Sequence, residues 1–523
     1  MAVRLRRRWL VAACLLPVAL SDVLAGEFRT PAISAVRVEW RTAIEQLRAE
    51  INTKPTIASH FTFAGRRRVP ARDPRSTPAL VQLNAITSPL FAGIGRSPVP
   101  VLLPFDTAGY LESRASGAPD SLSVPRSQAE FRPADMFHAG PAGYDAVFSL
   151  EPGAGDGLPR RTFTKPIEVQ ITGSILIYDL ADPAGGKGEP VKALAAQFPD
   201  LRRFIREGHV RYAFTRFGVP YVVSIQCLDS TPRARRLACR EAYPIAERFL
   251  KALRVAGGLP SQPRRDIASE PAERPPAVSP DFSYRRGGDI IAHSGARKLG
   301  GSPDFAAYSQ IRFPLQKAPA AIRSQSFGKR KTDDGIYPWR DNFCEARSFQ
   351  VGQCAAGYGH QGQDIRPAPC PPGSDNDGSC HPRKQAVVAV RDGVLIRSPK
   401  QQAATLQVNT RNEHIRFRYM HMNPSSMDAD GVLNGREVAE GEKIGVVSNY
   451  LDFPNGTSYH LHFDVQVFTR DGWLWVNPYT TLIAAYERLI RGRGREIGTD
   501  PPAVAQTLPE SVLRHAARQG REN

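Results

Sequence analysis

The segment at residues 459–467, YHLHFDVQV, constrains the fold more than any other, because its polar and apolar residues alternate strictly. Side chains two residues apart on a strand point to the same face of a sheet. One face is therefore apolar and suited to a core, while the other carries His460, His462, Asp464 and Gln466. The two imidazoles lie roughly 7 Å apart, about two strand rises. The polar face is then either exposed to solvent or part of a metal cleft.

Two further histidine segments lie in the same β-rich part of the chain. GHQGQD places His360 four residues before Asp364 with a glycine between them, and FRYMHM contains His421. Imidazole nitrogens and a carboxylate oxygen are typical zinc ligands, and catalytic zinc sites use three protein ligands. His360, Asp364 and one of His460 or His462 would complete such a set. An HxH pair alone is more often two surface histidines, so the interpretation depends on the three segments occurring together.

These segments carry a resemblance to a known family. HQGQDI, YMH and YHLHFDV, in this order, resemble the lysostaphin/LytM-type zinc metallopeptidases, and weaker similarity extends over residues 310–485. The resemblance implies a C-terminal, mainly antiparallel β peptidase domain that binds one Zn²⁺ per chain. It assigns the metal ligands to His360, Asp364 and His462. It assigns His421 and His460 to catalysis, as histidines that activate water or stabilise the developing oxyanion.

The same resemblance implies an activity. The chain would be a zinc-dependent endopeptidase that hydrolyses peptide cross-links of bacterial peptidoglycan by a zinc-activated water. The sequence departs from the family at Gln363, where an aliphatic residue is usual, and at Asp464, where glutamate is more frequent. Neither departure removes a ligand. Two other interpretations stay open: a non-catalytic LytM-like factor that binds cell wall or activates another hydrolase, and a basic polyanion-binding protein with incidental histidines.

The amino terminus predicts export. An arginine-rich start precedes residues 9–20, which are apolar but too short to span a membrane, and VLA offers a cleavage site after Ala25. Removal of this segment takes Cys14 with it, unless Cys14 belongs to a lipoprotein signal, and six of the seven cysteines remain. In an exported chain their spacing favours local disulfides. The expected pairs are Cys227–Cys239, Cys344–Cys354 and Cys370–Cys380. We expect a periplasmic or cell-envelope protein without a transmembrane span.

Composition divides the chain into five parts. They are a signal segment (1–25), a mixed α/β domain (26–256), a Pro/Gly-rich linker (257–299), the peptidase domain (300–490) and a loose tail (491–523). In the first domain we expect strands at 167–180, a hairpin around Phe217 and Gly218, and helices at 191–207 and 238–255.

The sequence says less about the binding partners of the protein and about the role of its first domain. The formal net charge of +18 favours polyanions. No nucleic-acid-binding motif is present, and peptidoglycan stem peptides are the expected partner. The first domain could inhibit the peptidase by folding over its groove, tether it to the wall or to a regulatory partner protein, or be an independent scaffold. The other histidines are interpreted as surface or structural residues: His60, His138, His209, His293, His381, His414 and His515.

Overall fold

The computed structural model describes residues 31–52, 78–105, 136–150, 163, 167–180, 188–206, 208–227, 236–260, 278–288, 309–322, 338–345, 347, 349, 351, 353–354, 358–367, 385–451 and 453–497. The predicted signal segment, the pair Cys370–Cys380 and the tail beyond residue 497 lie outside them. None of the helices within these ranges combines the length and the apolar character that crossing a bilayer requires.

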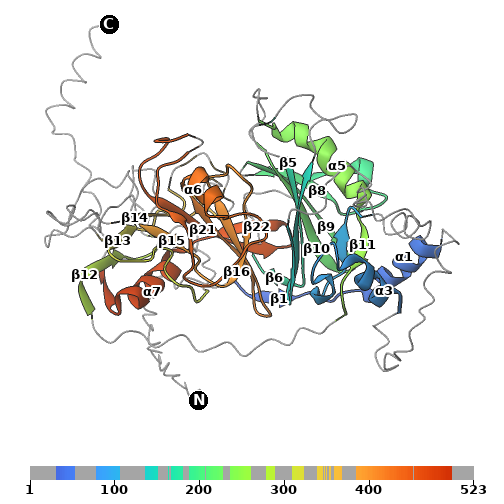
Figure 1. The fold of residues 1–523 in the computed structure, drawn as a ribbon, viewed down its shortest axis with the longest axis horizontal. Coiled ribbons are helices and arrows are strands. Elements are labelled where there is room, and N and C mark those ends of the chain that lie inside the picture. The colour runs from blue at the N-terminus through green and yellow to red at the C-terminus, as the bar shows by residue number, and fades with distance from the viewer. Residues whose placement is uncertain are drawn as a thin grey trace, which may run out of the picture.

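The first region, residues 31–260, is built around a seven-stranded antiparallel sheet (Figure 1). Its strand order is β3 (Met136–Gly140), β4 (Gly143–Leu150), β5 (Ile167–Ser174), β10 (Val219–Gln226), β9 (His209–Arg216), β8 (Arg202–Arg206) and β7 (Glu189–Pro190). The helices are α1 (Trp40–Asn52), α3 (Pro78–Thr87) and α5 (Ala242–Ala252). Two separate two-stranded sheets are also present. One pairs β1 (Ile33–Ala35) with β6 (Leu176–Tyr178), and the other pairs β2 (Val101–Leu103) with β11 (Arg254–Gly257). Strands dominate, so the predicted mixed α/β character is not confirmed.

Local sequence explains most of these elements. The predicted hairpin is present as β9 and β10, joined by Phe217 and Gly218, whose φ angles of 54° and 73° suit a tight two-residue turn. The helix predicted at 238–255 is present as α5. The helix predicted at 191–207 is wrong, because only a short 3-10 turn and then strand β8 form there. Pro199 lies inside this run, where it cannot continue a helix.

The second region is built around a second antiparallel sheet. Its strand order is β13 (Ala320–Ile322), β14 (Gln363–Pro367), β21 (Leu461–Thr469), β18 (His414–Met420), β17 (Ala404–Asn409), β16 (Gly393–Ile396) and β19 (Glu437–Val438), with β22 (Gly472–Val476) also paired to β21. A smaller pair, β15 (Ala386–Val388) with β20 (Lys443–Val446), and helices α6 (Pro424–Ala429) and α7 (Tyr479–Ile490) complete it. The apolar face expected for the HxH strand lies in the core of this region: Leu461, Phe463, Val465 and Val467.

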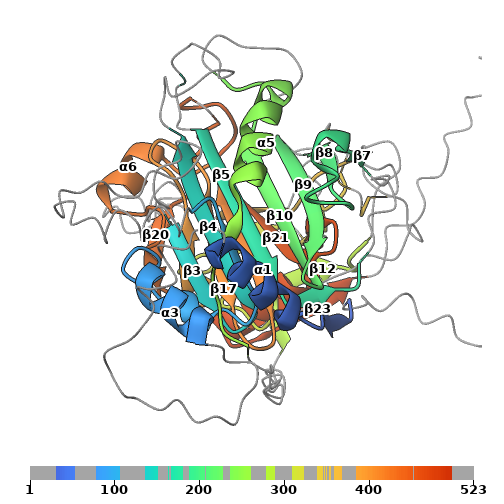
Figure 2. The ribbon, with the colours of Figure 1, turned by 90° about the vertical axis from the view of Figure 1, so that its right-hand side faces the viewer.

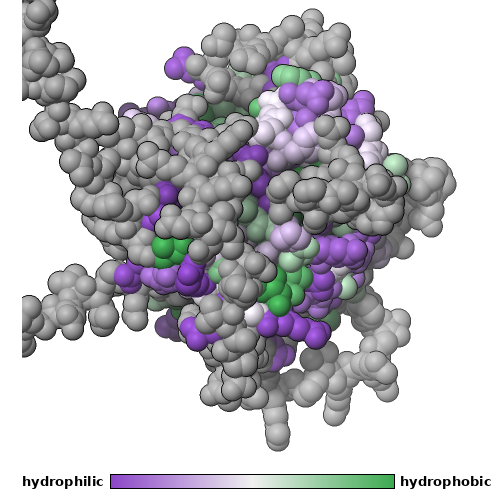
Figure 3. Space-filling view, turned by 90° about the vertical axis from the view of Figure 1, so that its left-hand side faces the viewer, coloured by the Kyte–Doolittle hydropathy of each residue, from purple (hydrophilic) through white to green (hydrophobic). Residues whose placement is uncertain are grey.

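Two strands occur where the sequence predicts no regular structure. β12 (Val278–Arg285) lies in the range assigned to the linker, and β23 (Arg493–Ile497) lies in the range assigned to the tail. They pair in parallel with each other, and Phe282 of β12 packs in the second core. Among the coloured residues in Figure 3, which views the end of the second region, hydrophilic ones predominate and hydrophobic ones form small separate groups.

The two regions pack sheet against sheet. Figure 2 shows α5 and α1 on the near face of the first sheet, with β17 and β21 of the second region behind it. Apolar contacts across this boundary join Ile177, Ala213 and Val222 to Phe468 and Trp473, and a second cluster joins Met136 and Val147 to Val394 and Ile396. The linker therefore connects two regions that share a packed interface.

A buried carboxylate stands at the centre of this interface. Asp145 on β4 accepts hydrogen bonds from Thr172 Oγ1 at 2.6 Å, His414 Nε2 at 2.8 Å and Arg416 Nη2 at 3.1 Å. The Arg416 guanidinium also stacks 4.1 Å from the Trp473 ring centroid. Burial alone would raise the pKa of Asp145, but the neighbouring His414 and Arg416 outweigh it and lower the pKa to about 2.

Replacing Asp145 by alanine is expected to lower the free energy of unfolding by about 3–5 kcal/mol, because the buried Arg416 charge loses its carboxylate. Denaturant unfolding measures the effect. The control Glu189→Ala removes a largely exposed partner of Arg203 and should cost only about 0–1 kcal/mol. Since the pKa of Asp145 is depressed, its contribution is present above roughly pH 4 and is lost as the pH falls towards 2. Equal effects of the two variants would contradict the prediction.

Candidate active site

Three neighbouring strands bring the predicted site residues together. β14 pairs with β21 so that Asp364 lies directly opposite His462, and β18 pairs with β21 so that Met420 lies opposite the same histidine. His360 precedes β14 by three residues and His460 directly precedes β21. The sequence segments that are separated by up to a hundred residues therefore meet at one end of the sheet.

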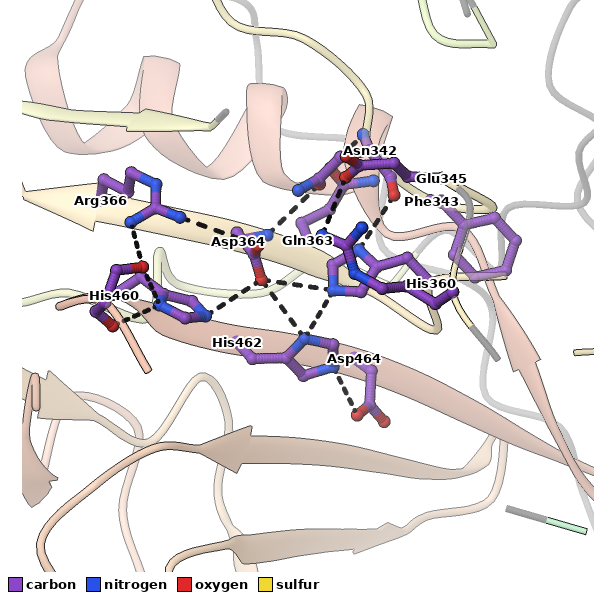
Figure 4. A network of polar contacts seen from close by, with 12 residues as sticks. Asn342, Phe343, Glu345, His360, Gln363, Asp364, Arg366, His460, His462 and Asp464 are labelled. Atoms are coloured by element: carbon purple, nitrogen blue, oxygen red, sulfur yellow. Dashed lines mark hydrogen bonds and ion pairs between the residues drawn. The ribbon is translucent and has the colours of Figure 1, made fainter. Parts of the chain in front are cut away.

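Three ligand-type atoms converge there. His360 Nε2 lies 3.0 Å from His462 Nδ1, and Asp364 Oδ1 lies 3.3 Å and 3.5 Å from these two nitrogens. Ligand-type atoms of all three residues lie within 4.8 Å of one another, and each residue is at most 5% exposed. Figure 4 shows Asp364 between His360 and His460, with His462 below it. This is the triad that the sequence resemblance assigns to the metal.

Hydrogen bonds to the outer ring nitrogens of His360 and His462 determine whether the inner nitrogens carry a proton or a free lone pair. His360 Nδ1 donates to the Asn342 carbonyl at 2.9 Å, and His462 Nε2 donates to Asp464 Oδ2 at 3.2 Å. These bonds assign the proton of each neutral ring to its outer nitrogen and direct the lone pair of the other nitrogen inwards. The two inner lone pairs would repel one another at 3.0 Å, and Asp364 Oδ1 is buried without a hydrogen bond of good geometry. This donor set fits a divalent cation such as zinc.

The other two predicted histidines lie beside the triad. His460 Nδ1 donates to the Ser458 carbonyl at 2.7 Å, which leaves Nε2 as the acceptor, 3.3 Å from Asp364 Oδ1. His421 Nδ1 donates to the Tyr450 carbonyl at 2.9 Å, and its ring centroid lies 4.6 Å from that of His460. His421 follows the end of β18 with a φ of 68°, a left-handed conformation that is rare outside glycine and common at functional sites.

Burial and charge set the protonation of the site. Burial, with the neighbouring His460 and His462, lowers the pKa of His421 to about 3, so this ring is neutral at pH 7. Burial alone would raise the pKa of Asp364, but the surrounding imidazoles hold it well below its usual range. Burial opposes the charge on His462, yet the neighbouring carboxylates of Asp364 and Asp464 raise its pKa. The site thus combines an anionic oxygen with neighbouring imidazoles.

A buried polar network supports the triad from behind. Gln363 donates to Asp341 Oδ1 at 2.6 Å and to Asn477 Oδ1 at 3.1 Å, and its oxygen accepts from the Asn342 amide at 3.1 Å. Asn342 in turn orients His360 through its carbonyl and contacts the Asp364 amide through its side chain at 3.3 Å. Gln363 is one of the two positions at which the sequence departs from the LytM-type pattern, and here its side chain is part of a buried network.

Replacing Gln363 by leucine should weaken zinc binding about 10–100-fold, because such outer partners orient ligands. It should also cost roughly 1–3 kcal/mol of stability, since Asp341 and the Asn342 amide lose their partner in a dry environment. The control is Gln407→Leu, another fully buried glutamine, whose partner is Arg416. Competition with a zinc chelator measures affinity. Equal zinc affinity in the Gln363 and Gln407 variants would show that the network does not position the ligands.

Asp464 links the site to the domain interface. Its Oδ2 accepts from His462 and from Arg418 Nε at 2.7 Å, and its Oδ1 accepts from Trp475 Nε1 at 2.9 Å. Asp464 is fully buried, and the next residue on the same face, Gln466, is 7% exposed. Further along this face, Phe468 packs at the boundary with the first region, roughly 20 Å from His462 at about 3.4 Å per residue.

The polar face of the HxH strand is therefore divided between two uses. Its first part carries the candidate site, and Phe468 further along packs against the first region. Sequence reasoning placed Asp464 on this face but missed its role as the acceptor of His462. It also missed Asn342, which lies 18 residues before His360 and has no local signal.

The other expectations have mixed outcomes. The disulfides Cys227–Cys239 and Cys344–Cys354 are present. His414 is fully buried in the interface and is structural, as interpreted. His138 and His209 are partly buried outside the site, whereas His60, His293, His381 and His515 lie outside the described residues.

No protein-family model and no curated protein matches the chain. A structure from Ruminococcus gnavus assigned as a glycyl-glycine endopeptidase, LytM, is 15% identical with a TM-score of 0.22, covering 37% of this chain and 65% of that one. Csd3 of Helicobacter pylori is 19% identical with a TM-score of 0.19, covering 34% of each chain. This chain spans less than two thirds of the length of either structure. Its similarity to these two structures is therefore coarse and covers about a third of its length.

Proposed function

We propose that this protein is a zinc-dependent endopeptidase that hydrolyses peptide cross-links of bacterial peptidoglycan outside the cytoplasm. The observation that supports the proposal best is the convergence of His360 Nε2, His462 Nδ1 and Asp364 Oδ1, with two further imidazoles beside them. Three ligands with a neighbouring base suit a catalytic metal site better than a structural one, which is usually closed by four ligands. The two disulfides support an oxidising compartment.

The five site residues have two kinds of role in the proposed reaction, metal binding and proton transfer. His360, Asp364 and His462 would hold zinc, which when bound polarises a scissile carbonyl and lowers the pKa of water. His460 and His421 each present an Nε2 acceptor, and one of them takes the proton of the attacking water. That proton then passes to the leaving amine as the carbon–nitrogen bond breaks. The other imidazole would assist at the carbonyl oxygen.

The test uses purified full-length protein. Metal analysis is expected to give one zinc per chain. Incubation with purified peptidoglycan should release fragments whose masses correspond to addition of one water at a peptide cross-link. Intact cross-links after incubation with zinc-loaded protein would overturn the enzymatic proposal.

A second candidate is a non-catalytic LytM-like factor that binds cell wall or activates another hydrolase. It is favoured by the burial of the site, because His421, the most exposed of the five residues, is only 8% exposed. This candidate predicts binding of cell wall without any new peptide ends. It also predicts that the protein accelerates a separate hydrolase equally well when His460 is replaced by alanine.

A further inference from the structure

A cavity lined by four arginines lies in the second region. Its volume is about 600 Å³, and residues 310–313 before β13, the turns at Arg391 and Glu440, and helix α7 contribute to its wall. The other three arginines are Arg312, Arg488 and Arg491. Figure 1 shows α7 at the end of the second region that lies away from the first sheet. Cavities of about 300–1,000 Å³ are typical of small-molecule sites.

Hydrogen bonds between lining residues place two of the guanidiniums at the cavity. Arg391 Nη1 donates to the Gln310 carbonyl at 3.1 Å, and Arg488 Nη2 donates to the Ile311 carbonyl at 2.6 Å. All four of these residues line the cavity. The two bonds therefore fix the charged ends of these arginines along its wall.

Arg312 is the arginine with the fewest protein partners. Its Nε is buried without a hydrogen-bond partner, and it forms no ion pair with a described residue. A Cβ at Gly441 would lie 3.0 Å from Arg312 Nη1, so glycine leaves room for this guanidinium next to Glu440. A buried N–H without an acceptor costs free energy, and an anionic ligand in the cavity would remove that cost.

The cavity retains an excess of positive charge. Arg391 is neutralised by Glu413, at 2.8 Å. The other three arginines have no carboxylate partner among the described residues, and Glu440 is the one acidic residue in the described lining. Asp392 lies close by, but its carboxylate accepts a hydrogen bond from the Glu440 amide at 2.7 Å. Three guanidiniums therefore face one carboxylate, and an anion is the expected ligand.

The cavity is separate from the candidate active site. Glu413, the partner of Arg391, directly precedes β18, whereas His421 directly follows this strand. Eight residue steps along a strand place these two residues roughly 25 Å apart. A ligand in the cavity therefore does not compete with a peptide at the metal triad.

The lining favours a phosphate group that is attached to a larger body. The planar guanidinium matches phosphate oxygens and binds them through two parallel hydrogen bonds. A phosphate monoester carries a charge of about −1.5 to −2 near pH 7, whereas a carboxylate carries only one negative charge. Ile311, Phe313 and Leu489 line the same cavity and offer apolar contacts to the rest of the ligand.

We propose that this cavity binds the phosphate monoester of a sugar phosphate or of a lipid headgroup, and that Arg312, Arg488 and Arg491 hold it. Both sources present the same phosphate chemistry to the arginines. The proposal does not depend on the peptidase function, because it concerns a different part of the second region.

The test measures binding to the full-length protein. Calorimetry follows glucose 1-phosphate, and co-sedimentation follows phosphatidylcholine vesicles with and without phosphatidic acid. Arg312→Gln and Arg491→Asn should each weaken binding roughly tenfold or more, because each removes charge-assisted hydrogen bonds. Asparagine is chosen at Arg491 because it tolerates the left-handed backbone there, where φ is 53°.

Two further variants separate a built site from general attraction to a basic protein. Gly441→Ala keeps every charge but displaces the Arg312 guanidinium, so it should also weaken binding. Arg470→Gln removes one exposed positive charge between β21 and β22 and should leave the affinity unchanged. Thermal unfolding checks that each variant is folded.

The outcomes distinguish the two sources. Saturable binding of glucose 1-phosphate that weakens in the cavity variants supports a soluble ligand, whereas binding only to vesicles with phosphatidic acid, weakened in the same way, supports a lipid headgroup. Equally tight binding of glucuronate would overturn the assignment to phosphate. Failure of both phosphate ligands to bind, or an equal loss in Arg470→Gln and Arg312→Gln, would overturn the site itself. Absent hydrolysis of peptide cross-links would leave these results unaffected.

Discussion

His462→Ala is expected to lose both stoichiometric zinc and hydrolytic activity. The variant removes one of three converging ligand atoms, and two protein ligands rarely hold a catalytic zinc tightly. It also leaves Asp464 without the imidazole that it orients. Metal analysis after dialysis, together with cross-link hydrolysis, measures the loss.

The control for this variant is another buried histidine. His414→Ala removes an imidazole of the domain interface and should reduce stability while zinc stays stoichiometric. A His462→Ala protein that keeps one zinc per chain would show that His462 is not a ligand.

His460→Ala and His421→Ala are expected to retain zinc and to lose about a hundred- to ten-thousand-fold in kcat, because each removes an imidazole that either takes the proton of the attacking water or assists at the carbonyl oxygen. The result at His460 is the more informative. Its Nε2 lies 3.3 Å from Asp364 Oδ1, the same distance as His360 Nε2. Distance alone therefore does not distinguish a base from a ligand at His460. The zinc content of the His460→Ala protein does.

The outcome is assessed by comparing the two measurements. Loss of zinc in His460→Ala would move this histidine into the ligand set. Retained zinc with normal kcat would remove it from the catalytic machinery. The same comparison applies to His421→Ala, whose ring is further from the triad, with its centroid 6.1 Å from that of His462.

Sequence periodicity predicted the central features of the site. Strict alternation in β21 correctly placed Leu461 and Phe463 in the core and His460 and His462 on the polar side. These predictions succeed because a two-residue repeat and short motifs are local properties of the chain.

Long-range pairings could not be predicted in the same way. β12 and β23 have no strong alternation, and each becomes a strand by pairing with a segment some 200 residues away in sequence, as Ser283 does with Arg495. The partner of Asp145 is equally remote, since Arg416 lies 271 residues along the chain. Polar residues such as these are interpreted as surface residues until the facing sheet is known.

The packing of the first region against β21 gives the candidate site a direction. Beyond His462, Asp464 and Gln466 on the same face comes Phe468, which packs in a cluster with residues of the first region. A peptide that followed the strand past His462 would therefore meet the first region at Phe468. We expect an extended peptide at the candidate site to continue in the opposite direction, away from the first region. Short bridges that approach from that side would fit this arrangement better than a continuous polymer.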